Sequence, residues 1–166
     1  MQEISIDNLN ENVINLIGKD WCLITAGTID NYNTMTASWG SMGFLWNKPV
    51  VTIFVRPQRH TFGFIESNDS FTLSFFTEEY RKALTLCGTK SGKDTDKAKE
   101  AGITPYSPTE DSVAFTEARL VLKCKKLYKS LLNEESFIDK SIIPAWYKDG
   151  DFHYAYVAEI ENIWKK

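Results

Sequence analysis

The sequence runs NTMTASWGSMGF over Asn33–Phe44 and VVTIFV over Val50–Val55, and RPQRHT follows directly over Arg56–Thr61. The middle segment is apolar and β-branched, which is typical of a buried strand. Proline has no N–H group to give to a sheet, so Pro57 predicts the end of that strand, and a helix is expected over Thr61–Ser67. A run of small hydroxyl residues, a strand and a cationic turn therefore follow one another.

Further strands are expected on both sides of this stretch. The pattern predicts them over Trp21–Ile29, Thr34–Phe44, Phe71–Phe76, Phe115–Leu127 and Phe152–Trp164. Asp30-Asn31 predicts a hairpin turn, and Gly40 and Gly43 indicate a bulge or a close backbone approach. The strands outnumber the helices and follow one another in an antiparallel order. This pattern favours a mainly β fold, a closed or half-closed antiparallel β-barrel with peripheral helices.

The expected helices are short. One is predicted over Asn10–Ile17, with Asn10 as its cap and Gly18 at its end. Two more are expected over Glu79–Leu86 and Thr95–Ala101. Together the elements predict one domain over residues 1–166, a length that suffices for a real core.

Composition and charge restrict the function classes. Hydrophobic residues make up 43% of the chain and charged residues 25%, which is the balance of a globular protein, and aromatic residues reach 13%. The formal net charge is -3, so the electrostatic footprint of a nucleic-acid-binding protein is missing. Aromatic side chains also make good stacking partners for flat ligands.

The chain shows no sign of a disulfide framework, a metal site or a membrane span. Cys22, Cys87 and Cys124 are odd in number and form no CxxC pair, and His60 and His153 lack the spacing of metal ligands. The N-terminal residues do not resemble a signal peptide, and no apolar run is long enough to cross a bilayer. We therefore expect reduced thiols in a cytoplasmic protein.

The cationic turn is a candidate phosphate site. Arg56, Arg59, His60 and Thr61 lie between a strand end and a helix start, where arginine forks and unpaired N–H groups favour an anion. The alternative is a solvated basic turn in which Thr61 caps the helix with its hydroxyl.

A second cationic loop follows at CGTKSGKDTDK, from Cys87 to Lys97. Ser91-Gly92 would form a backbone nest for an anion, and Lys93 would add a point charge. The spacing is not that of a P-loop, and an ordinary exposed charged loop is the alternative. Two such loops in an acidic chain strengthen each other, because one phosphate would use both.

The small hydroxyl strand is a candidate ring site. Its residues leave room for a ligand against the backbone, and they are Thr34, Thr36, Ala37, Ser38 and Gly40. Trp39 and Trp46 would cover the face or rim of a ring. The alternative is a barrel strand with small residues where it bends. A ring with a phosphate is typical of a nucleotide or a flavin.

Taken together, these segments resemble the flavin reductase-like family of the flavoredoxin type. The resemblance rests on NTMTASWG at Asn33–Gly40, VRPQRHT at Val55–Thr61, NDSFTLSFF at Asn68–Phe76, GTKSGKD at Gly88–Asp94 and GDFHYAYVAEI at Gly150–Ile160. These blocks are spread in the family's order over most of the chain.

The resemblance implies an FMN-binding split barrel, a six-stranded antiparallel Greek key, in a homodimer with FMN near the interface. It implies that Asn33 and Thr36–Trp39, that is Thr36, Ala37, Ser38 and Trp39, contact the isoalloxazine ring and its side chain. It further implies a phosphate site made of Arg56, His60 and Thr61, with help from Ser91, Gly92 and Lys93, and the cationic turn adds Arg59 to these candidates. Trp164 on the last strand would come near the flavin, although a core position is the alternative.

We therefore expect a flavin-dependent oxidoreductase with FMN as cofactor. NADH, NADPH or a redox protein would be the electron donor, and free flavin or another small molecule the acceptor. The pattern identifies no catalytic acid or base and no metal ligand. A non-enzymatic FMN electron carrier and a ligand-binding barrel without redox activity remain alternatives.

Overall fold

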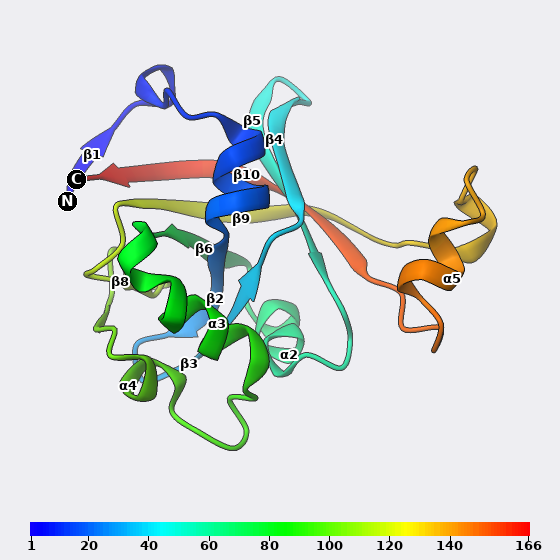
Figure 1. Ribbon diagram of the computed structural model, residues 1–166. Coiled ribbons are helices and arrows are strands. Elements are labelled where there is room, and N and C mark those ends of the chain that lie inside the picture. The colour runs from blue at the N-terminus through cyan, green and yellow to red at the C-terminus, as the bar shows by residue number, and fades with distance from the viewer.

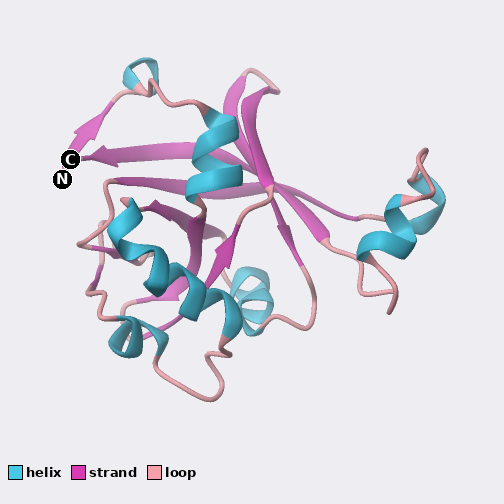
Figure 2. Cartoon of the chain, in the orientation of Figure 1, coloured by secondary structure: helices cyan, strands magenta, loops and turns pink.

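A twisted antiparallel sheet forms the centre of the protein, as the computed structural model of residues 1–166 shows (Figures 1 and 2). Eight strands take part, in the order β3-β2-β6-β9-β10-β5-β4, with β1 also paired to β10. These strands are β1 (Gln2–Ile4), β2 (Cys22–Thr28), β3 (Asn31–Ala37), β4 (Gly40–Leu45), β5 (Lys48–Val55), β6 (Ser70–Phe75), β9 (Leu120–Leu131) and β10 (Tyr154–Lys165). A separate pair is formed by β7 (Pro105–Tyr106) and β8 (Ala114–Phe115).

The two edge strands of the sheet, β3 and β4, do not pair with each other. The sheet is therefore split and open, and the predicted mainly β, antiparallel fold is confirmed in its half-closed form. The structure has eight strands in this sheet where the resemblance implies six. No helix has the length and apolar character needed to span a membrane.

Helices cover the sheet and extend from it. They are α1 (Val13–Asn15), α2 (His60–Ser67), α3 (Arg81–Thr89), α4 (Lys97–Ala101) and α5 (Ile142–Trp146), with 3-10 turns η1 (Ile6–Asn8), η3 (Glu78–Tyr80) and η4 (Glu134–Ser136) and a π-helical turn η2 (Leu16–Asp20). Both α2 and α3 pack on β2 and β3. By contrast, α5 lies in the β9–β10 excursion (residues 132–153), which projects away from the sheet (Figure 1).

The core has two parts. The larger cluster contains 21 buried residues, among them Phe71, Phe75 and Tyr156, and lies within the fold of the main sheet. The smaller one contains 11 buried residues, including Cys87 and Phe115, and connects α3 and α4 to the sheet. Buried and less buried residues alternate along β10, because successive strand residues point to opposite sides, whereas β6 is buried along its whole length.

The single strand predicted over Thr34–Phe44 is wrong. The chain forms β3 and β4 instead, and these strands lie at opposite ends of the sheet order. Ser38 and Trp39 connect them across the mouth of the split, so a hydrophobicity pattern that runs on without a break hides the change of partner. The hairpin turn before β3 lies one residue earlier than predicted, because Thr28 pairs with Asn31.

The N-terminal helix also differs from the prediction. It begins at Val13, and Asn12 rather than Asn10 caps it, because Asn12 Oδ1 accepts a hydrogen bond of 3.1 Å from the Asn15 N–H group. Gly18 does not end the helix but lies inside the π-helical turn that follows α1. The cap residue is the one whose carbonyl oxygen reaches the free N–H groups of the first turn, and Asn10 lies too early in the chain to do so.

The glycine at position 40 is required by the close approach of β4 to β5. A Cβ atom there would lie 2.8 Å from the Thr52 carbonyl oxygen, while a Cβ atom at Gly43, on the same strand, would meet nothing within 4 Å. We expect Gly40→Ala to lower the free energy of unfolding by about 1–3 kcal/mol, since backbone must move to accept the methyl group. Urea unfolding measures this.

Gly43→Ala is the matched control, with an expected change within about 0.5 kcal/mol. Equal losses in the two variants would show that the contact with Thr52 is not the cause.

Candidate functional site

An aromatic cavity of about 260 Å³ opens where β3 and β5 end beside the β9–β10 excursion. Its lining is formed by Met35, Thr36, Ala37, Ser38, Trp39, Phe54, Arg56, Arg59, Trp146 and His153. The predicted small residues of the ring site, Thr36–Trp39, thus meet the predicted cationic turn in one place. Nothing in the sequence linked Trp146 to either of them.

Aromatic rings form the walls of this cavity. The Trp39 and Trp146 ring centroids are 5.0 Å apart with the rings near perpendicular, and the Trp39 and His153 centroids are 5.2 Å apart. Such edge and tilted arrangements are the favoured geometries of aromatic pairs. Walls of this kind, next to small residues of a strand, suit a flat ring.

The Arg56 side chain binds residues of the β9–β10 excursion and does not point freely into the cavity. Its Nη2 donates to the Trp146 carbonyl oxygen at 2.8 Å, its Nη1 pairs with the Asp151 carboxylate, and its Nε donates to His153 Nε2 at 3.3 Å. All three guanidinium nitrogens of Arg56 therefore have protein partners. The predicted contact of Arg56 with a phosphate stays a prediction, and the structure places this side chain in a role that fixes the cavity wall.

His153 is buried and neutral. Burial, together with the nearby Arg56 charge, lowers the pKa of His153 to about 4. Because arginine can only donate, His153 Nε2 accepts from Arg56, and Nδ1 carries the proton that faces the Tyr147 hydroxyl at 2.9 Å. The imidazole thereby joins the strand end to the excursion.

A basic cavity of about 140 Å³ lies beyond Arg59, which lines both cavities. It has no hydrophobic lining residue, and its members are Gln58, Arg59, His60, Thr61, Gly88, Thr89, Lys90, Ser91 and Lys97. The two cationic loops that the sequence singled out therefore meet here, as a shared phosphate site requires.

Arg59 has a buried nitrogen without a partner. Its Nη2 is buried and donates to no protein group, although the side chain as a whole is half-buried. Burying a charged donor without a partner is costly, so such atoms point to a ligand or an ordered water. The position between an aromatic cavity and a basic one suits the phosphate end of a ring ligand.

Asn33 and Gly92 connect a third cavity to the turn. Asn33 Nδ2 donates to Thr61 Oγ1 at 2.7 Å, and a Cβ atom at Gly92 would lie only 1.9 Å from Asn33 Oδ1. Asn33, Gly92 and Lys93 line this loop cavity, which measures about 480 Å³. Glycine at position 92 therefore lets the loop close on the Asn33 amide.

Thr61 does not cap α2, so the alternative in which its hydroxyl caps the helix is wrong. Arg59 holds the cap position of α2 without a side-chain hydrogen bond, and Thr61 is buried with its hydroxyl on Asn33. His60 is half-buried, and its ring stacks edge-on against Phe64 at 5.2 Å. Both residues line the basic cavity.

Lys97 is a member of the site that sequence reasoning missed. It is 5% exposed, its Nζ donates to the carbonyl oxygens of Thr34 at 2.7 Å and Cys87 at 2.9 Å, and it lines both the basic and the loop cavity. Burial, aided by the Arg59 charge, lowers the pKa of Lys97 to about 8. In the sequence, Lys97 stands in a run of charged residues and looks like an exposed lysine. Only the packing of α4 shows that its side chain is buried.

Two predicted aromatic covers lie elsewhere. Trp164 stands near the far end of β10, where it pairs with Glu3 and Val121 and packs against the smaller core cluster. Trp46 is exposed at the turn between β4 and β5, with Tyr128 as its ring neighbour at 6.2 Å. The structure of one chain brings neither residue to the aromatic cavity.

Comparison with known proteins decides the family. The family model described as the Flavin reductase like domain matches residues 15–165. The chain belongs to the flavin reductase-like family. A comparison with curated protein sequences gives no match.

Solved structures of flavin reductase-like proteins share the fold. An FMN-binding domain of a flavin reductases-like enzyme from Shewanella baltica has a TM-score of 0.70 at 16% identity, over 99% of this chain and 76% of that one. Flavoredoxin from Methanosarcina acetivorans has a TM-score of 0.67 at 21% identity, over 100% and 76%. An NADH:FAD oxidoreductase from Streptomyces globisporus has a TM-score of 0.64 at 16% identity, over 89% and 75%.

The neutral His153 of this flavin reductase-like chain predicts acid sensitivity. An unfolded histidine binds a proton below a pKa of about 6.5, while folded His153 does not until about pH 4, so this residue's contribution to stability is lost as the pH falls between those values. The unfolding free energy of the natural protein should therefore fall when the pH is lowered from 7 to 5. In the His153→Gln variant we expect this fall to be smaller by about 2 kcal/mol. Urea unfolding at the two pH values measures the difference, and equal losses would contradict the assignment.

Proposed function

We propose that the protein is an FMN-binding oxidoreductase that passes electrons from NAD(P)H or a protein donor through bound FMN to a flavin or another acceptor. The observation that carries this proposal is the free, buried Nη2 of Arg59 between the aromatic and the basic cavity. It supplies the charged donor that a phosphate needs, at the point where a ring and a phosphate must join.

The residues present fit FMN. The aromatic cavity, which is lined by Thr36–Trp39 and by Trp146, would hold the isoalloxazine ring. Thr61 and Ser91, with the charges of Arg59 and Lys97, would hold the phosphate in the basic cavity. Membership of the flavin reductase-like family, whose similar structures include an FMN-binding domain, supports the same assignment.

The chain's own residues bind and orient, and bound FMN supplies the electron chemistry. Trp39 and Trp146 would border the bound ring, and Arg56 holds Trp146 by its carbonyl oxygen. His153 holds its proton on Nδ1, toward Tyr147, so no proton donor to the ring is assigned.

We also propose a homodimer with FMN near the interface. Phe44 and Trp46 at the β4–β5 hairpin are 71% and 55% exposed, and such apolar side chains favour a protein contact. Trp164 would approach FMN only in such an assembly. Sedimentation at several protein concentrations tests the dimer.

Removing the Arg59 charge is the direct test of the phosphate site. We expect Arg59→Ala to weaken FMN binding by about 1.5–3 kcal/mol, the value of a charge-assisted hydrogen bond. Flavin fluorescence quenching on titration with the FMN-free protein measures the affinity.

Lys99→Ala is the matched control, because it removes a charge from α4 at an exposed position that lines none of these cavities. It should leave the affinity unchanged. Unchanged affinity in Arg59→Ala as well would refute the phosphate site. If the natural protein binds no FMN at all, a ligand-binding barrel without redox activity is the alternative that stays.

The electron donor is tested on the FMN-loaded protein without oxygen. If the protein is an NAD(P)H-dependent reductase, NADH or NADPH will bleach the flavin absorption band near 450 nm, on the order of one equivalent per bound FMN. The similarity to flavoredoxin favours a second candidate, an electron carrier. Bleaching by a reduced ferredoxin-like protein without any response to the nicotinamides would decide for the carrier.

A further inference from the structure

Trp39 separates two different spaces. The aromatic cavity lies on one side, and an apolar cleft of about 490 Å³ opens on the other. The walls of the cleft come from the N-terminal helical segment, with Ile14, Ile17 and Gly18, and from the crossing into β4, with Ser38, Trp39 and Met42. The proposed function uses only the first of the two spaces.

The chemistry of the cleft contrasts with that of its neighbour. None of its nine lining residues is charged, and the polar side chains among them are the hydroxyls of Ser38 and Ser41. The aromatic cavity, by comparison, contains Arg56 and Arg59. Because transfer of an ion from water to an uncharged wall is costly, the cleft selects for neutral molecules.

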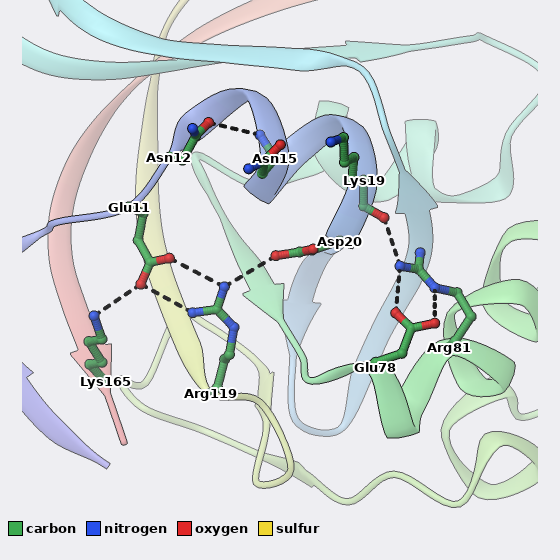
Figure 3. Close-up of polar contacts among 9 residues, drawn as sticks. All are labelled: Glu11, Asn12, Asn15, Lys19, Asp20, Glu78, Arg81, Arg119 and Lys165. Atoms are coloured by element: carbon green, nitrogen blue, oxygen red, sulfur yellow. Dashed lines mark hydrogen bonds and ion pairs between the residues drawn. The ribbon is translucent and has the colours of Figure 1, made fainter.

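The outer wall of the cleft is held in place by charged contacts (Figure 3). Arg119 pairs with Glu11 at 3.1 Å and with Asp20 at 3.4 Å, and so ties both ends of the helical segment to the start of β9. Arg81 Nη2 donates to the Lys19 carbonyl oxygen at 2.7 Å. The wall is therefore fixed by the folded body and does not depend on a ligand for its shape.

The helical segment also has an unusual backbone. Leu16–Asp20 form a π-helical turn, and Trp21, the next residue, has φ of +66° with the Arg81 guanidinium 4.3 Å from its ring centroid. Single π-helical turns are rare in proteins, and those that occur are often found at functional sites. Here the turn contains Gly18, where a Cβ atom would meet nothing within 4 Å.

Apolar surface faces this space. Ile14 is 79% exposed and Trp39 is 40% exposed. A flat apolar molecule in the cleft would cover parts of both, and each Å² of apolar surface removed from water contributes roughly 25 cal/mol.

We propose that the cleft binds an uncharged ring compound with a carbonyl or hydroxyl group. The ring packs between Ile14 and Trp39, and the polar group accepts from or donates to the Ser38 or Ser41 hydroxyl. Trp39 is common to both spaces and stands between them, so the cleft is a second site, separate from the proposed FMN site. The binding of a neutral ring there does not rest on the proposed function.

The test uses coumarin, a neutral bicyclic lactone, and coumarin-3-carboxylate, the same ring with a negative charge. Isothermal titration calorimetry on the full-length protein, with FMN bound if it binds, is expected to show one coumarin site per chain. The carboxylate should bind at least about tenfold more weakly. Prior FMN binding should leave the coumarin affinity within about twofold, because the sites are separate.

Gly18→Leu should fill the cleft and weaken coumarin binding at least about tenfold. The matched control is Gly63→Leu, since Gly63 also lies in a helix with open space around it and lines neither cavity. Should Gly18→Leu not fold, Ile14→Glu replaces it, because this exposed position tolerates a charge that would disfavour a neutral apolar ring.

Three results would overturn the proposal. They are no coumarin binding by the natural protein, unchanged binding in Gly18→Leu or Ile14→Glu, and loss of coumarin binding when FMN is bound. The last result would place coumarin in the aromatic cavity. Failure of the FMN proposal is seen separately, in the FMN titration, and leaves the coumarin measurement valid.

Discussion

The site depends on how β10 lies between β5 and β9. Tyr154, its first residue, pairs with Val55 on one side and with Leu131 on the other. This register brings the residue after β5, Arg56, beside the residue before β10, His153. The Leu132 N–H group also donates to the His153 carbonyl oxygen at 3.0 Å, so the excursion begins and ends at one point of the sheet. A shift of the register by one residue would turn every side chain to the other face and dissolve the cavity.

The two arginines of the turn show why sequence alone identifies a charged site only in part. Arg56 and Arg59 have the same chemistry and lie three residues apart, so the sequence treats both as phosphate ligands. The structure gives Arg56 three protein partners and leaves Arg59 with a free buried nitrogen. The difference comes from Asp151 and Trp146, which lie about ninety residues further along the chain. No local pattern contains such a distant partner.

The strands were predictable where the local pattern agrees with the final pairing. VVTIFV at Val50–Val55 is almost wholly apolar, and it lies within β5, which is paired on both sides, with β10 and with β4. The prediction failed over Thr34–Phe44, because nothing in the sequence marks the crossing from β3 to β4 except small residues. The long strand predicted from Phe115 also begins later than expected, at Leu120 in β9. Phe115 belongs to β8 instead, and the turn at Ala118 separates the two strands. Strand existence is therefore a local property here, whereas partner choice is not.

The crossing that the prediction missed is also the most informative part of the site. Ser38 and Trp39 leave β3 at one edge of the split sheet and enter β4 at the other, so they face space on both sides. A closed barrel would bury such a connection or carry it outside. In the split sheet, one indole forms a wall between a space with two arginines and a space with no charge. A protein that must hold an anionic ligand next to a neutral one needs such a partition, because the charges that attract the first ligand would otherwise keep water around the second.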